Sequence, residues 1–441
     1  MVTLVLLISG AEFVGRGPAR YLRESQNWND FLSPYIQSDA WRHGRDPYSS
    51  RELIRAWPIE IPRPAFVDRD AAEGTLQKKR GIPTPYPLTA LVVLSPFTTL
   101  RWKAAELLWS TLSIVLVSAT FFALLALYNH GRLDVRGQLF LAAGLLLAPI
   151  HTGLATANPA MLAIGLSALA LWATQSGKPW AAGVLLGLAV CIKPPIGACL
   201  LLYTCLRRDW KLVATAVALV SGAMLLGVWR MYVAGVPWLS SYLDCSRHIF
   251  ERGSLADFTS GDPVRFNMVD LRILVYALFG NAPLAQALPL LCGAVLLAAW
   301  YYGITIDGKA SGLDLSTLFS LSLLPIYHRF YDAALLVWPV CWTILAASQK
   351  TIRTIAIILI MPFFVPGGVL LQGLAERGYI PVSIADRWWW QAIVLPHENW
   401  SLLLLCFLLI YSMHTNRSQS SREVVEAGIS VQQAGTGQPR N

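Results

Sequence analysis

Two aspartates in the long polar segment near the N-terminus have the side chain that general-base catalysis needs. They are Asp30 and Asp39. A carboxylate can take a proton from an attacking hydroxyl group. Residues 30–43 are expected to form a helix lying on a membrane surface, which ends before Pro47 because the residue before a proline avoids the helical region. The alternative is that both carboxylates cap a helix or lie in solvent.

A single lysine interrupts an apolar stretch in the middle of the chain. Lys193 follows Val-Cys-Ile and precedes two prolines. An ionisable residue at membrane depth is costly and is therefore a candidate functional residue. A compact ammonium group suits a phosphate of a lipid-linked substrate. The alternative is that the side chain extends to the membrane interface.

A third polar group lies between two apolar runs in residues 327–332, which read Tyr-His-Arg-Phe-Tyr-Asp. His328 could orient a phosphate or a sugar hydroxyl, and Tyr331 could donate a hydrogen bond to the same group. The alternative is a belt of interfacial aromatic residues. Asn158, which precedes a proline, is either the polar start of a helix or part of a plain turn.

The composition indicates that these residues belong to an integral membrane protein. The 441 residues are 55% hydrophobic and only 14% charged, whereas soluble domains carry about 25% charged residues. The formal net charge of +9 comes from short basic clusters between apolar runs. That placement is typical of cytoplasmic loops and argues against nucleic-acid binding. We predict an all-α polytopic bundle of about 10–12 membrane helices.

Several apolar runs are too short to cross a bilayer, which takes about 20 residues. Three pairs, 138–150/158–173, 180–192/195–206 and 313–326/333–347, each predict two short helices that meet at a polar break. Broken backbone at membrane depth is tolerated only inside protein or beside a wet cavity. Because basic clusters flank the other ends of these pairs, we predict that the breaks converge on the non-cytoplasmic side.

The predicted layout is one membrane domain over 1–413, with a first outer loop at 11–88. The N-terminal apolar run, 1–13, is interpreted as the stub of a first membrane helix, because it is too short to span. The polar residues 414–441 predict a disordered cytoplasmic tail.

Four stretches give the chain a resemblance to a known family. They are Asp30-Phe31 with Tyr35 and Gly44-Arg45-Asp46-Pro47-Tyr48; Pro85-Tyr86-Pro87-Leu88; the segment from Asn158 to Trp210, with Gly183–Pro194 as its most specific part; and His328 with Tyr331. On these residues the chain resembles the family 87 glycosyltransferases of the GT-C superfamily. These are multi-pass enzymes related to polyprenyl-phosphate-mannose-dependent mannosyltransferases.

The resemblance implies an inverting transfer of a hexose, with mannose the expected sugar. The donor would be a polyprenyl-phosphate sugar, and the acceptor a lipid or glycan on the outer face of a bacterial inner membrane. Asp30 would be the base, with Asp39 as second choice. Lys193, His328 and Tyr331 would bind the donor phosphate. No cofactor, no metal ion and no nucleic acid is expected; membrane lipids are the other partners.

Two other functions stay open at this level. A membrane transporter or lipid flippase also uses broken helices near the membrane midplane, although such proteins usually contain an internal repeat and none is visible in this sequence. The second is a non-catalytic scaffold of an envelope assembly complex. Loss of the acid and base candidates without any effect would favour the scaffold.

Overall fold

The computed structural model describes residues 1–24, 29–77, 81–262, 264–304 and 312–415. These residues form helices and connecting loops, and within them the β-type pairing is limited to one isolated bridge between Met268 and Arg329. The prediction of an all-α polytopic membrane protein is confirmed. The predicted disordered tail lies almost wholly outside the described residues.

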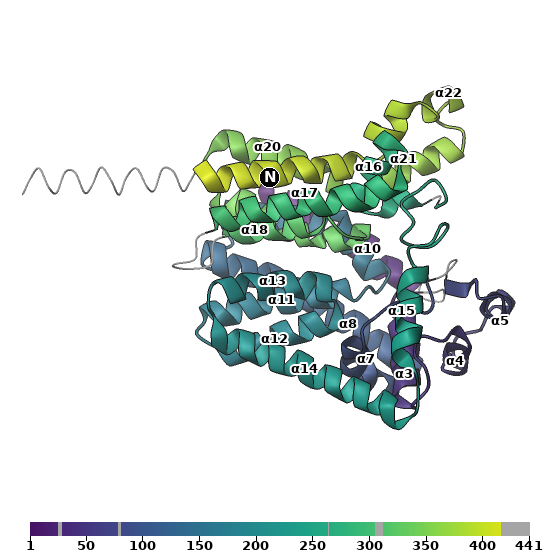
Figure 1. Cartoon of the computed structure of the whole chain (residues 1–441). Helices are drawn as coiled ribbons and strands as arrows, with labels where there is room; N and C mark the ends of the chain where they lie inside the picture. Colours follow the sequence, from purple (N-terminus) through teal and green to yellow (C-terminus); the bar gives the residue numbers. More distant parts are fainter. Residues whose placement is uncertain (25–28, 78–80, 263, 305–311, 416–441) are drawn as a thin grey trace, which may run out of the picture.

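Among the described residues, four helical stretches are long and apolar enough to cross a membrane. They are Val2–Arg23, α8 (Trp102–Asn129), α14 (Trp210–Val233) and α17 (Ala282–Gly303). Two more pairs qualify if each bent pair is one span: α9 (Val135–Leu146) with α10 (Ala148–Ala155), and Lys350–Phe364 with α21 (Gly367–Glu376). The long helices run along one direction of the bundle, as α14 and α17 show (Figure 1).

The interpretation of the N-terminus as a short stub is wrong. Helix α1 (Val2–Arg16) is followed directly by α2 (Pro18–Glu24), and together they give a candidate span of 22 residues. The prediction ended the run where the apolar residues end. A helix needs only its own backbone hydrogen bonds to continue, so it extends into the polar residues. The first loop therefore begins after Glu24, not at residue 11.

The short helices meet at breaks, as predicted. Lys193 alone separates α12 (Pro179–Ile192) from α13 (Pro194–Leu206), and α11 (Ala160–Gln175) follows the break at Asn158. The third break lies between α18 (Gly312–Ser322) and a run of η3 (Phe330–Leu336), α19 (Val337–Cys341) and η4 (Trp342–Ala346). Two additional breaks were missed. Lys350–Phe364 meets α21 at a 46° bend, and α9 ends at Leu146 while α10 begins at Ala148, with a 50° bend. Pro149, near the start of α10, cannot continue a helix from the preceding residues.

The predicted helix at 30–43 is observed as α3 (Leu32–Arg42). Most of its side chains are buried against other parts of the protein, and its position at a membrane surface stays a prediction. The capping role considered for Asp30 is wrong. Leu32 N donates to Asn29 Oδ1 at 3.1 Å, and no side chain of the N-cap residue takes part.

The remaining helices lie between these spans or follow them. Between the first span and α8 lie α4 (Ser50–Arg55), α5 (Ala65–Ala72), α7 (Leu88–Leu94) and η1 (Ser95–Thr99); the others are α15 (Trp238–His248), η2 (Arg265–Asn267), α16 (Leu271–Phe279), α20 (Lys350–Ile360), η5 (Met361–Phe364), α22 (Val382–Ala385), η6 (Trp390–Val394) and a last helix over 397–415. Helices α3, α4, α5 and α15 gather at one end, on the right of Figure 1.

An aromatic stack fixes the start of α3 against the membrane helices. The ring of Phe31 is fully buried and lies parallel to that of Trp109, with centroids 4.2 Å apart. Trp109 Nε1 donates to the carbonyl of Ala157 at 2.9 Å. The stack therefore holds Asp30, the neighbour of Phe31, beside the turn between α10 and α11.

Close approach of α12 and α13 at their break depends on a glycine. A Cβ atom on Gly197 would lie 2.5 Å from Val190 N, in the backbone of α12. We expect Gly197→Ala to lower the stability of the purified protein by about 1–3 kcal/mol through overpacking. Gly222→Ala in α14 is the matched control, because a Cβ atom there meets nothing within 4 Å. Equal thermal unfolding temperatures for the two variants would contradict the prediction.

Candidate functional site

Four chain segments bring polar side chains together at the breaks. Asp30 follows α2, Asn158 lies between α10 and α11, Lys193 separates α12 from α13, and Asp332 lies in η3. Asn158 Nδ2 donates to Asp30 Oδ2 at 2.8 Å, and Lys193 Nζ donates to Asn158 Oδ1 at 3.3 Å. Lys193 also forms an ion pair with Asp332 Oδ1. The result is a continuous chain of hydrogen bonds from the first loop to the third break.

Lys193 has its charge satisfied from three sides. Besides Asn158 and Asp332, its Nζ lies 4.8 Å from the centroid of the Tyr331 ring, a favourable position for a cation. The side chain is only 15% exposed. The residue therefore does not extend to solvent, which was the alternative interpretation of the sequence.

His328 extends the chain beyond Asp332. Its Nδ1 lies 3.2 Å from Asp332 Oδ2, and the side chain is 1% exposed. The amide N–H of Arg329 donates to the same oxygen at 3.2 Å. Among the described residues, the opposite ring nitrogen, Nε2, has no hydrogen-bond partner. This buried nitrogen is thus the one polar atom of the imidazole without a partner in the described part of the chain.

Arg329 is the second fixed cation of this region. Its Nε donates to the Tyr327 hydroxyl at 2.8 Å, and its Nη2 donates to the carbonyl of Leu255 at 2.9 Å. The backbone of the segment is fixed as well, because Val269 N donates to the carbonyl of His328 at 2.9 Å. The loop between α15 and α16, which contains Leu255 and Val269, therefore positions the third break.

Burial raises the pKa of Asp30 above its ordinary value of 3.8. The hydrogen bond from Asn158 and the charges of Arg329 and Lys193 oppose this shift only in part. A carboxylate with a raised pKa is a stronger base once it is ionised. The position of Asp30 therefore favours proton transfer from a nearby hydroxyl group.

This shift predicts the acid side of the pH–rate profile. If Asp30 must be ionised to act, the rate falls as the pH falls through its folded-state pKa. Because that pKa is raised, we expect kcat/KM to decline at a pH above 3.8. A kcat/KM that stays constant down to pH 3.8, in protein shown to remain folded, would contradict the assignment.

The structure does not connect Asp39 to this chain of hydrogen bonds. Its carboxylate pairs with Arg45 Nη2 at 2.9 Å and lies 3.3 Å from His43 Nδ1. Asp39 lies near the far end of α3, which separates it from Asp30 by about 13 Å along the helix. Of the two aspartates in the described part of the chain, Asp30 is the one that the charges of Lys193 and Arg329 act on, and Asn158 joins it to Lys193.

Three residues of this region had no assigned role in the sequence analysis. Asp332 joins Lys193 and His328, and Asn158 joins Lys193 and Asp30. Tyr86 is the third: burial raises the pKa of its phenol well above 10, and the charges of Asp30 and Asp332 add to the effect. Asp332 and Asn158 each lie next to a predicted break, and this position could have identified them from the sequence. Tyr86 lies in the stretch Pro85-Tyr86-Pro87-Leu88, but it carries no charge that would mark it as a site residue.

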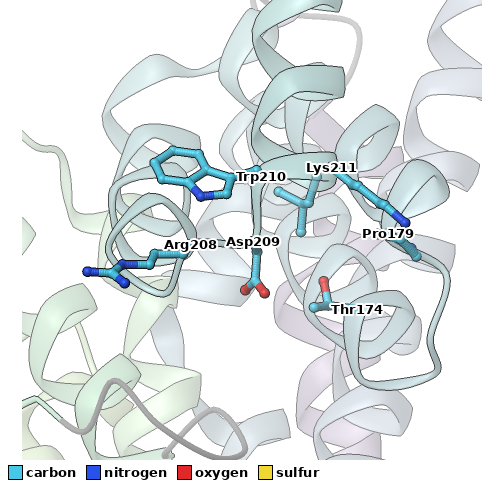
Figure 2. Close-up of a pocket in the computed structure, with 7 residues that line it drawn as sticks. Thr174, Pro179, Arg208, Asp209, Trp210 and Lys211 are labelled. Carbon is cyan, nitrogen blue, oxygen red and sulfur yellow. The ribbon is translucent and has the colours of Figure 1, made fainter.

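A cavity of about 360 Å³ lies elsewhere, at the opposite end of α12. Figure 2 shows Asp209 between Arg208 and Lys211, whose side chains extend in opposite directions. Lys193 is separated from this cavity by the length of α12, about 20 Å. The cavity is therefore not part of the group around Asp30.

The fold and this group of residues define a multi-pass membrane protein with a polar, largely buried site at the breaks of its helices. The sequence model of glycosyltransferase family 87 matches residues 84–326, more than half of the chain. The chain belongs to this family and is a glycosyltransferase. Comparisons with curated proteins and with solved structures found no match. Asn158 and Lys193 lie within the matched residues, whereas Asp30 and His328 lie outside them.

Proposed function

We propose that this glycosyltransferase has a GT-C-type fold and moves a hexose, with mannose the expected sugar, from a polyprenyl-phosphate donor to a lipid or glycan acceptor. The observation that carries the proposal is the chain from Asp30 through Asn158, Lys193 and Asp332 to His328. In this chain, a carboxyl group with a raised pKa lies close to buried cations, which supports a role for Asp30 as the base. A transfer from a phosphate-linked sugar needs both kinds of group.

The proposed reaction is a single displacement that inverts the anomeric carbon. The acceptor oxygen forms a bond to that carbon, and its proton passes to Asp30. The bond between the anomeric carbon and the phosphate oxygen breaks, and its electron pair leaves with the polyprenyl phosphate. Lys193, His328 and Tyr331 bind this phosphate, because preorganised cations and donors stabilise the charge that develops on a leaving group.

Two features support a lipid-phosphate donor over a soluble nucleotide sugar. The buried cations lie at breaks between apolar helices, where a polyprenyl chain can remain in lipid. The sequence also contains no nucleotide-binding glycine motif. We expect no cofactor and no metal ion, as the resemblance to the lipid-phosphate mannosyltransferases implies.

The proposed orientation places the site on the non-cytoplasmic side of a bacterial inner membrane. Lys178, Arg208 and Lys211 lie at the end of α12 opposite to Lys193. Basic residues collect in cytoplasmic loops, so the end of the bundle with α3 and α15 (Figure 1) would face the periplasm or the exterior.

The test uses purified full-length protein in lipid vesicles, with membrane glycolipids as acceptors. We expect radiolabelled polyprenyl-phosphate mannose to give a labelled product and GDP-mannose to give none. Transfer from the nucleotide sugar, with none from any polyprenyl-phosphate sugar, would overturn the proposal. Retention of the anomeric configuration in the product would overturn the single-displacement step alone.

A further inference from the structure

Both the oxygen and the nitrogen of the Asn158 side-chain amide form hydrogen bonds, and these bonds fix the orientation of the amide. Its Oδ1 accepts from Ala160 N at 2.9 Å and from Lys193 Nζ at 3.3 Å. Its Nδ2 donates to Asp30 Oδ2 at 2.8 Å. An amide has donors on one end and acceptors on the other. Two donors facing Oδ1 therefore exclude the flipped orientation and leave Nδ2 directed at the aspartate.

The turn that carries Asn158 is fixed independently of its side chain. Asp30 N donates to the carbonyl of Thr156 at 2.8 Å, and Trp109 Nε1 donates to the carbonyl of Ala157 at 2.9 Å. Ala157 has a φ of 55°, a left-handed conformation that costs about 1–3 kcal/mol and persists only where the surroundings impose it. Asn158 is 1% exposed, so its amide has little room for another rotamer.

We propose that Asn158 is a positioning residue, which couples the cation Lys193 to the base Asp30 through its oriented amide. This inference rests on the proposed function of Asp30. One carboxylate oxygen is held by Nδ2, and the Thr156 side chain also interacts with the carboxylate. The acceptor's proton would pass to Oδ1, the oxygen that Nδ2 does not hold. The amide also favours the ionised form, since a hydrogen bond to a charged carboxylate stabilises it.

Other groups also affect the pKa of Asp30, and the experiment must distinguish their effects from that of Asn158. The titratable or charged side chains whose interactions with Asp30 are resolved are Lys193, Arg329, Tyr86, Tyr327 and Tyr331. Burial raises the pKa of Asp30, and the hydrogen bond from Asn158 is the largest of the effects that lower it. Loss of the amide should therefore raise this pKa further, while Lys193 and Arg329 remain in place.

The experiment reads the ionisation of Asp30 directly. Isotope-edited infrared spectra of protein labelled at aspartate carboxyls, recorded against pH, give the midpoint of the Asp30 band after subtraction of the Asp30→Asn spectrum. We expect Asn158→Ala to move this midpoint upward by about one pH unit or more, the size of a hydrogen bond to a charged group. The acid limb of kcat/KM should move by the same amount and recover at higher pH.

Two further variants keep the test decisive. Asn158→Ser introduces a hydroxyl that can accept from Ala160 N but is too short to reach Asp30. It should shift the midpoint by the same amount, and it replaces Asn158→Ala in the test if that variant does not fold. Asn399→Ala, at another buried asparagine whose amide donates to the carbonyl of Met268, should leave the midpoint unchanged. An unshifted midpoint in both Asn158 variants would overturn the inference. A shifted midpoint in protein whose wild type transfers no sugar would instead sink the proposed function.

Discussion

Replacement of Asp30 by asparagine is expected to lower kcat for sugar transfer by about 10²- to 10⁴-fold, the usual contribution of a general base. The amide has nearly the same shape as the carboxylate, but it cannot take a proton. Asn158 Nδ2 can still donate to the amide oxygen that replaces Oδ2. The variant should therefore fold and bind the donor normally. Single-turnover transfer from a radiolabelled polyprenyl-phosphate sugar measures the chemical step.

Asp39→Asn is the matched control. Asp39, on α3, is also an aspartate of the first loop, but it pairs with Arg45 and His43, which follow that helix. The Asp39–Arg45 pair is partly buried, with side chains 18% and 26% exposed, and it lies away from Asp30, so this variant should keep close to full transfer per folded molecule. If Asp30→Asn retains wild-type transfer, or if Asp39→Asn loses it instead, Asp30 is not the base.

The breaks were predictable from the sequence because ionisable residues stand out within apolar runs. Lys193 interrupts a segment that is otherwise hydrophobic, and residues 327–332 hold a cation, an anion and a histidine. The cost of these groups in lipid places them in protein or beside water. The membrane class and the short paired helices follow from the same contrast.

The partners within the site were not predictable in this way. The bond between Asn158 and Asp30 depends on a turn in which Ala157 has a left-handed conformation, and alanine gives no sign of that. The pairing of Lys193 with Asp332 joins residues 139 positions apart. Periodicity and hydropathy report local burial, but they do not say which breaks meet.

The predicted helix ends were wrong where the helix and the apolar run do not end at the same residue. The N-terminal helices continue to Glu24, past the last apolar residue, because a helix end that leaves the membrane can remain helical in polar surroundings. The bend at Leu147 was missed because its neighbours on both sides are apolar. In both places the backbone changes at a position that hydropathy does not mark.

Variants of the ion pair between Lys193 and Asp332 should distinguish an effect on folding from an effect on sugar transfer. Asp332 is 5% exposed and Lys193 15% exposed at their side chains. Removal of one partner from a buried pair leaves an uncompensated charge and costs about 3–5 kcal/mol. We expect Asp332→Asn to lower the stability by this order. Lys193→Met should lower it less, because Asp332 keeps its contacts with His328 and the amide of Arg329.

The double variant Lys193→Met/Asp332→Asn should recover much of the lost stability, since a neutral pair leaves no buried charge. Transfer should stay about 10²- to 10³-fold below wild type in the double variant, because the cation for the departing phosphate is missing. Asp270→Asn supplies the control: it breaks a pair of similar burial, with Arg272 at 2.7 Å, and should lower stability but spare transfer per folded molecule. Full transfer by the folded double variant would show that Lys193 contributes to stability but not to sugar transfer.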